Sequence, residues 1–222
     1  MLDRRRFVTW NVILLVSLAF VIQQVVMKSW LSSFDQDAAR LSRELHASRE
    51  IFGNTVKLGF RWAIFIMSIP LVIVAIIRRS WIPIGGFLLV FLFETGMTGS
   101  LKLAIGRTFP YDHYFYENVD VSVGEMAFPS GHAVNVVSLI GYLAWYFSRG
   151  WSKARRMISW ALVALAAIDV GVSSWLIQTH WPTDLVAGYL IGAIALLAVV
   201  ALLNASGVSP SATAQRSPAT RL

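Results

Sequence analysis

The feature that most constrains this chain is a set of six long apolar segments separated by polar connections. A transmembrane helix needs about 20 mostly apolar residues to cross the hydrocarbon core of a bilayer. Segments of this kind occur at residues 7–27, 60–77, 81–101, 133–147, 157–177 and 185–203. A soluble domain would not be 56% hydrophobic and only 14% charged. The sequence therefore predicts an all-α membrane protein, a polytopic bundle of six transmembrane helices.

The domain organisation follows from the same pattern. One bundle accounts for residues 1–204 as a single domain, and the Ser-, Ala-, Thr- and Pro-rich residues 205–222 predict a disordered tail. No convincing small-residue cleavage site follows the first apolar segment, so we expect an uncleaved anchor. The absence of cysteine excludes disulfides and cysteine-ligated metals.

Lysine and arginine in the flanks predict the orientation, because cytoplasmic connections carry an excess of both. If six spans alternate, the basic groups on one side are residues 4–6, 78–79, 149–156 and the arginines of the tail. We expect that side, with both chain termini, to be cytoplasmic, and the natural location to be a bacterial plasma membrane. Because these flanks explain much of the net charge of +7, nucleic-acid binding is not expected.

Three connections then face outward, at residues 28–59, 102–131 and 178–184. The first mixes acidic and basic side chains with apolar ones at Leu41, Leu45 and Ile51. This spacing predicts an amphipathic extracytoplasmic helix that lies on the membrane surface. We expect it to cap the bundle without chemistry, and a role in lipid access is the alternative.

Two of the four histidines stand at the outer ends of predicted helices. His132 follows the turn Pro129-Ser130-Gly131 and leads into the fourth segment. Such a turn offers backbone N–H groups at a helix N-terminus, where an anion such as phosphate is favoured. His180 precedes Pro182, which suits the first turn of the sixth helix.

Asp184 stands four residues after His180. A carboxylate there could accept a hydrogen bond from one imidazole nitrogen and leave the other free as a nucleophile. Each motif alone has a simpler explanation, as a turn or as an interfacial anchor. The predicted topology, however, places both histidines and Lys102 at the same surface of the membrane.

The order of a lysine, Pro-Ser-Gly-His and then His-x-x-x-Asp resembles the type 2 phosphatidic acid phosphatase (PAP2) superfamily of lipid phosphate phosphatases. The resemblance covers residues 102–192. It implies that His180 attacks phosphorus and becomes a phosphohistidine, that Asp184 orients it, and that His132 acts as acid and then base. The resemblance also implies that the phosphoryl oxygens are held by Lys102, Ser130 and Gly131. No cofactor and no metal are implied.

The chain departs from the family pattern at two positions. Phe109 and Ser174 stand where the family has phosphate-gripping arginines. Each loss should cost about ten- to a hundredfold unless it is replaced. Arg107, two residues before Phe109, is the expected replacement, and Gln178 is a weaker candidate.

Four further acidic residues lie outside these motifs. Asp112 and Glu117 lie in an aromatic-rich loop, and we hypothesise that they contact hydroxyl or amine groups of a lipid headgroup. Glu94 and Asp169 fall inside predicted spans, where a structural helix-to-helix contact is the expected role and a proton relay is the alternative. The spacing of Gly188 and Gly192 predicts close helix packing.

The function that these residues favour is hydrolysis of a lipid phosphate or diphosphate at the outer face of the membrane. Polyprenyl diphosphate, phosphatidate and phosphatidylglycerophosphate are the substrate classes that the resemblance implies. A phosphotransferase would use the same phosphohistidine with another acceptor. A non-catalytic relative that binds phospholipid is the third possibility, since two arginines are absent. The sequence does not indicate an oligomeric state.

Overall fold

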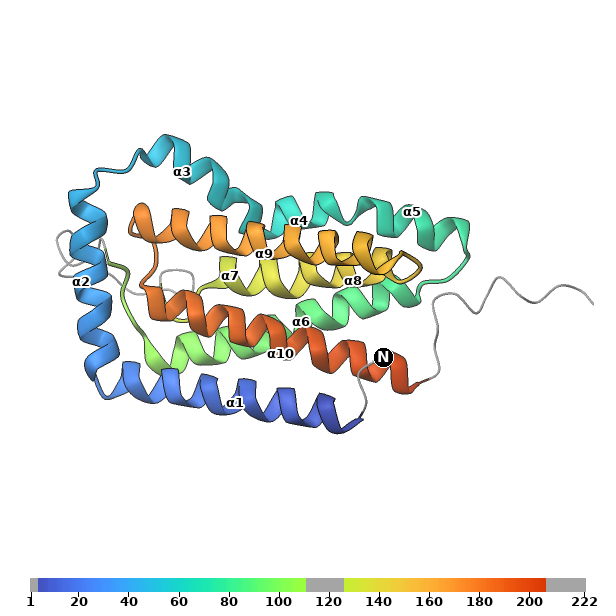
Figure 1. The fold of residues 1–222 in the computed structure, drawn as a ribbon, viewed down its shortest axis with the longest axis horizontal. Coiled ribbons are helices and arrows are strands. Elements are labelled where there is room, and N and C mark those ends of the chain that lie inside the picture. Colours follow the sequence, from blue (N-terminus) through green and yellow to red (C-terminus); the bar gives the residue numbers. More distant parts are fainter. Residues whose placement is uncertain (1–3, 111–125, 207–222) are drawn as a thin grey trace, which may run out of the picture.

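The computed structural model describes residues 4–110 and 126–206, and Figure 1 shows their arrangement. The predicted loop residues Asp112 and Glu117 and the predicted disordered tail, except its first two residues, lie outside these ranges. The helical elements are α1 (Arg4–Val26), α2 (Trp30–Glu44), α3 (Arg49–Val56), η1 (Lys57–Gly59), α4 (Arg61–Met67), α5 (Ile69–Ile77), α6 (Ile82–Ile105), α7 (Gly131–Asn135), η4 (Val136–Ile140), α8 (Gly141–Ser148), α9 (Lys153–Leu176) and α10 (Pro182–Ala205).

The all-helical prediction is confirmed, and helices occupy all six predicted positions. Within the described ranges, four helices are each long and apolar enough to cross a membrane: α1, α6, α9 and α10. A fifth candidate is the pair Glu50–Gly59 and Arg61–Ile77, which is bent by 60°. The run α7–η4–α8 is interrupted by a π-helical segment and is not among these candidates. The structure thus supports four to five spans, and the predicted count of six is not confirmed.

Two helix ends differ from the prediction, because capping residues determine where the helices begin and end. Helix α6 continues past the predicted end at residue 101 and stops at Gly106, whose φ of 59° is left-handed. Lys102 therefore lies in the last turn of a helix and not in a loop. Helix α9 begins at Lys153 because the Ser152 side chain accepts a hydrogen bond from the Arg155 N–H.

The connection at residues 28–59 differs more strongly from its prediction. It forms two helices, α2 and α3, and not one amphipathic helix. The apolar side chains of Leu41, Leu45 and Ile51 are exposed, whereas α2 buries Asp35, Ala39 and Ser42. The small and polar face of α2 thus packs on the protein, and its apolar face points outward.

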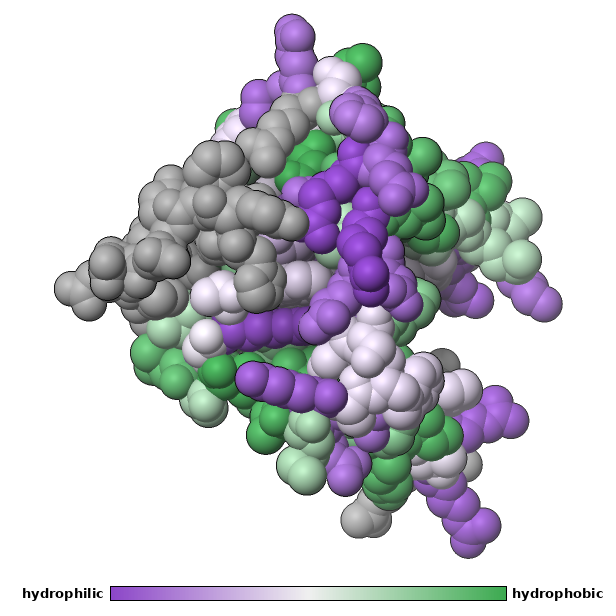
Figure 2. Space-filling view, turned by 90° about the vertical axis from the view of Figure 1, so that its left-hand side faces the viewer, coloured by the Kyte–Doolittle hydropathy of each residue, from purple (hydrophilic) through white to green (hydrophobic). Residues whose placement is uncertain are grey.

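Helix α2 crosses one end of the bundle, nearly perpendicular to the long helices (Figure 1). The Trp175 side chain at the end of α9 donates a hydrogen bond to the Ala38 carbonyl at 2.9 Å, and the Gln178 amide donates to the Ala39 carbonyl at 3.2 Å. Hydrophilic side chains form a band over this end of the molecule (Figure 2). The basic turns at residues 78–79 and 149–156 lie at the opposite end, as do the start of α1 and the end of α10.

Helix α10 packs against α1, α6 and α7, so it occupies the centre of the bundle. The close packing predicted for its glycines is confirmed. A Cβ at Gly188 would lie 2.6 Å from the Ser130 carbonyl oxygen, and one at Gly192 would lie 2.8 Å from the Val134 carbonyl oxygen. Only glycine permits this approach, and it brings the start of α7 directly onto α10.

The helix-to-helix contact expected of Glu94 is also present. Glu94 is fully buried in α6, and its carboxylate lies 3.9 Å from the guanidinium of Arg61 in α4. Thr95 donates a hydrogen bond to the same carboxylate at 2.9 Å. The contact joins α4 to α6. Asp169 of α9 is half-buried.

Candidate active site

Two imidazoles lie side by side at the end of the bundle that α2 covers. The ring centroids of His132 and His180 are 5.8 Å apart. His132 belongs to the first turn of α7, and His180 stands two residues before α10. Phe60 packs edge-on against His132 at 4.8 Å, and Phe109 packs against His180 at 5.7 Å. The structure thus brings together two histidines that are 48 positions apart in the sequence.

The two histidine motifs are tied together through the backbone. The Ser130 N–H donates a hydrogen bond to the Asp184 carbonyl at 3.0 Å, so the Pro-Ser-Gly turn is fixed to the first turn of α10. The Ser130 hydroxyl accepts from the Ala133 N–H at 3.4 Å and caps α7. Apart from its chain neighbours and the backbone of its own helix, no described atom lies within 4 Å of a Cβ built on Gly131, so there is space beside the turn.

Asp184 is fully buried behind His180. Its Oδ2 atom accepts a hydrogen bond from the Trp181 N–H at 2.9 Å and lies 3.6 Å from Nδ1 of His180. That distance is too long for the predicted hydrogen bond, and Nδ1 of His180 has no hydrogen-bond partner among the described residues. The carboxylate is therefore adjacent to the imidazole without being bonded to it.

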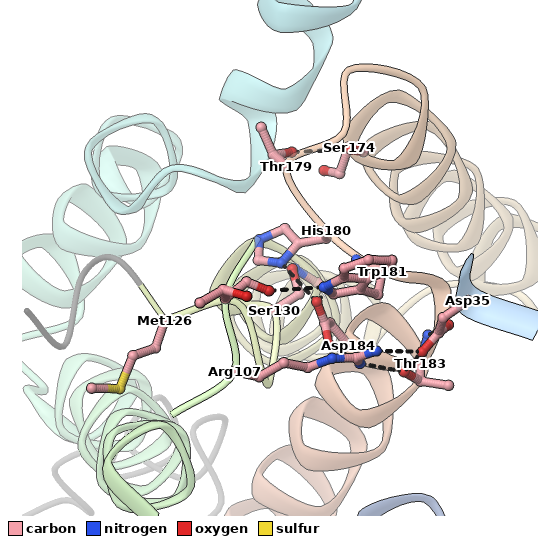
Figure 3. Close-up of polar contacts among 12 residues, drawn as sticks. Asp35, Arg107, Met126, Ser130, Ser174, Thr179, His180, Trp181, Thr183 and Asp184 are labelled. Atoms are coloured by element: carbon pink, nitrogen blue, oxygen red, sulfur yellow. Dashed lines mark hydrogen bonds and ion pairs between the residues drawn. The ribbon is translucent and has the colours of Figure 1, made fainter. Parts of the chain in front are cut away.

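Arg107 contacts protein acids on the side of Asp184 away from His180 (Figure 3). Its Nη1 donates to Asp184 Oδ1 at 2.8 Å and to the Thr183 hydroxyl at 2.7 Å, and its Nη2 donates to Asp35 Oδ2 at 2.7 Å. The guanidinium also lies 4.9 Å from the centre of the Trp181 ring. The expected phosphate-binding arginine is thus shared between two buried carboxylates.

Asp35 of α2 is a site residue that the sequence analysis missed. It is fully buried, and its carboxylate also accepts hydrogen bonds from the N–H of Thr183, at 3.0 Å, and from the Thr183 hydroxyl. Burial raises the pKa of Asp35, and the neighbouring Arg107 charge opposes that rise. No local pattern distinguishes Asp35 from the exposed Asp37, because the partners of Asp35 lie 72 and 148 positions away.

Lys102 reaches the same end of the bundle from the last turn of α6. Its ammonium donates a hydrogen bond to the Met126 carbonyl, which leads into the Pro-Ser-Gly turn. Phe109 fills space beside His180, and Ser174 is buried with its hydroxyl unpartnered among the described residues. Neither Phe109 nor Ser174 supplies a positive charge. No group of three metal-ligating side chains is found within residues 4–110 and 126–206.

These observations define a helical membrane protein with paired histidines, a buried acid and a lysine at one end of the bundle. The chain belongs to the PAP2 superfamily: the family model matches residues 83–207, more than half of its 222 residues. It is therefore a multi-pass membrane protein of that superfamily, and the predicted superfamily membership is confirmed.

Two known proteins are similar to this chain. An Escherichia coli (strain K12) protein named "Putative undecaprenyl-diphosphatase YbjG" is 26% identical over 152 residues, which cover 59% of this chain and 72% of that protein. The crystal structure of a phosphatidylglycerolphosphate phosphatase from Bacillus subtilis matches with a TM-score of 0.74 at 19% identity. That match covers 90% of this chain and 98% of the other, and it shows a common fold.

Proposed function

We propose that this protein is a membrane lipid phosphatase that hydrolyses a lipid phosphate or diphosphate through a phosphohistidine on His180. The observation that carries the proposal is the 5.8 Å separation of the His132 and His180 rings, with Asp184 behind His180. A phosphoryl group between the two rings would have a nucleophile on one side and a proton donor near its leaving oxygen. We place this site at the extracytoplasmic face of the plasma membrane, with both termini in the cytoplasm.

The first chemical step transfers the phosphoryl group to the protein. A ring nitrogen of His180 forms a bond to phosphorus, and the bond from phosphorus to the lipid or phosphate leaving oxygen breaks. His132 gives its proton to that oxygen. Asp184 stabilises the positive charge that develops on the His180 ring, and a small rotation of the ring would close the 3.6 Å gap to a hydrogen bond.

The second step restores the histidine. His132, now neutral, takes a proton from a water molecule as the water oxygen bonds to phosphorus. The bond between phosphorus and His180 breaks, and inorganic phosphate leaves. Lys102, the Ser130 hydroxyl and the backbone N–H of Gly131 would bind the phosphoryl oxygens in both steps.

The contacts of Arg107 favour a role in positioning over the predicted phosphate binding. Both of its terminal nitrogens bond to protein oxygens, and its partners include two carboxylates. We therefore assign Arg107 to holding Asp184 in place, with phosphate contact as the alternative. With Phe109 and Ser174 at the positions where the motif resemblance implies family arginines, Lys102 would be the main cation near the phosphoryl group.

The substrate classes proposed are polyprenyl diphosphate, phosphatidate and phosphatidylglycerophosphate. The names of the two relatives fall in the first and third of these classes. Since 26% and 19% identity do not transfer a substrate, the choice among them is a matter for assay.

The test is a phosphate-release assay in detergent over lipids of all three classes, comparing the wild type with His180→Ala. We expect release by the wild type with water as the only acceptor, and none above background from His180→Ala. Release that requires an added lipid or sugar acceptor would indicate a phosphotransferase. Binding of these lipids without any turnover would indicate a non-catalytic relative.

A further inference from the structure

Asp35 is a buried acid with no part in the chemistry described above. It belongs to α2, outside residues 83–207 that the family model matches. A fully buried carboxylate is costly unless its oxygens are bonded, and Asp35 satisfies both of its oxygens with donors from elsewhere in the chain. The identity of those donors indicates what the residue does.

The first donor group is the amino-terminal turn of α10. Thr183 is the second residue of that helix, and its N–H has no partner within the helix. Asp35 accepts from this N–H at 3.0 Å and so caps α10 from a different helix. A negative charge at this position also stabilises the helix dipole. The next residue of the same turn is Asp184.

The second donor is Arg107. Asp35 and Asp184 lie on either side of its guanidinium, and both bonds are short, at 2.7 and 2.8 Å. Side chains at these three positions form one chain of charge-assisted hydrogen bonds, and Figure 3 shows it leading toward His180. Without the charge of Asp35, the guanidinium would be free to turn toward an anionic substrate and to release Asp184.

We propose that Asp35 is a positioning residue: it holds Arg107 and the first turn of α10 so that Asp184 stays beside His180. The surface helix α2 would then contribute a residue that positions the active site, in addition to covering it. This inference rests on the proposed phosphatase function.

Asp35→Asn tests the proposal, because asparagine keeps the size of the side chain and removes its charge. Asp37→Asn is the matched control, since Asp37 stands on the same helix with a side chain that is 68% exposed. Turnover is measured per folded protein with a lipid phosphate that the wild type hydrolyses. We expect Asp35→Asn to lower kcat at least about tenfold with little change in KM, because the lost contact acts on the transition state. Asp37→Asn should stay within about twofold of the wild type.

A double variant separates positioning from general stabilisation. If Asp35 acts through Arg107, Asp35→Asn added to Arg107→Gln should lower kcat by no more than about threefold beyond Arg107→Gln alone. Effects that multiply in full would overturn the proposal. So would an Asp35→Asn protein that melts at a lower temperature but keeps the kcat of the wild type.

If Asp35→Asn yields no folded protein, Thr183→Val carries the test. It removes the hydroxyl shared by Asp35 and Arg107 and leaves both charges in place. A reduced kcat with an unchanged KM supports the proposal, and an unchanged kcat overturns it. A wild type that releases no phosphate from any lipid contradicts the proposed function itself, and this inference falls with it.

Discussion

At the scale of single residues, Arg107 links the two buried carboxylates of the site through ion pairs. Asp35 and Asp184 are both fully buried, and Arg107 is the only lysine or arginine in salt-bridge contact with either one among the described residues. Removing one partner of a buried ion pair leaves an uncompensated charge, which costs about 3–5 kcal/mol. Arg107 therefore affects both stability and the position of Asp184.

Arg107→Ala should lower turnover by about ten- to a hundredfold, because a hydrogen bond to each carboxylate is lost. It should also lower the melting temperature. Phosphate release and thermal unfolding in detergent measure the two effects. The control is Arg40→Ala, which breaks an exposed pair with Asp37 and should change neither. Full turnover in Arg107→Ala would show that Asp184 is held by other means.

The sequence predicts some of these residues well and others not at all. His132 and His180 could be brought together from the sequence, because each stands at the end of an apolar segment that the predicted alternation of spans places on the same side. Asp35 could not, because its burial depends on contacts with Arg107 and Thr183 that no local pattern records. Arg107 was predicted as a phosphate-binding residue, but its contacts with Asp35 and Asp184 were not predicted.

At the scale of helices, the closest approach is between α10 and the turn that carries His132. A Cβ at Gly188 would lie 2.6 Å from the Ser130 carbonyl oxygen and 2.8 Å from the Ala133 side chain, and neither can move without shifting α7. The spacing of Gly188 and Gly192 predicted this packing. The interruption of the fourth segment by η4 was not predicted, because the hydrophobic pattern of a segment does not distinguish an α-helix from one that contains a π-helical turn.

Gly188→Ala should therefore disturb the site. Overpacking of this kind costs about 1–3 kcal/mol, and it moves His132 away from His180. We expect a lower melting temperature together with a lower kcat. Gly96→Ala is the control, because a Cβ at Gly96 in α6 meets nothing within 4 Å. Equal behaviour of the two variants would mean that α7 and α10 are less tightly packed than described.

At the scale of the whole molecule, the two ends of the bundle differ in charge and in structure. The basic turns at residues 78–79 and 149–156 lie at one end, and α2 covers the other. The apolar segments and their basic flanks were sufficient to predict this division. They were not sufficient for the count of spans, because α4 and α5 form a bent unit with the preceding residues 50–59 and a π-helical segment interrupts the run α7–η4–α8.

The orientation can be measured because the natural chain has no cysteine. Asp37→Cys on α2 and Lys153→Cys at the start of α9 each introduce one exposed thiol. In intact cells a membrane-impermeant maleimide should label position 37, and position 153 should be labelled only after the membrane is permeabilised. The reverse pattern would place the histidines at the cytoplasmic face.

The most direct test of the account is to trap the phosphorylated histidine. An aryl phosphate has a leaving group that needs no proton, so His132→Ala should still form the phosphohistidine but hydrolyse it slowly. With a radiolabelled aryl phosphate and an alkaline quench, we predict a burst of one aryl group per protein and label on His180. His132→Ala combined with His180→Ala should carry no label. Label that persists in the double variant, or turnover of the wild type without any phosphohistidine, would contradict the account.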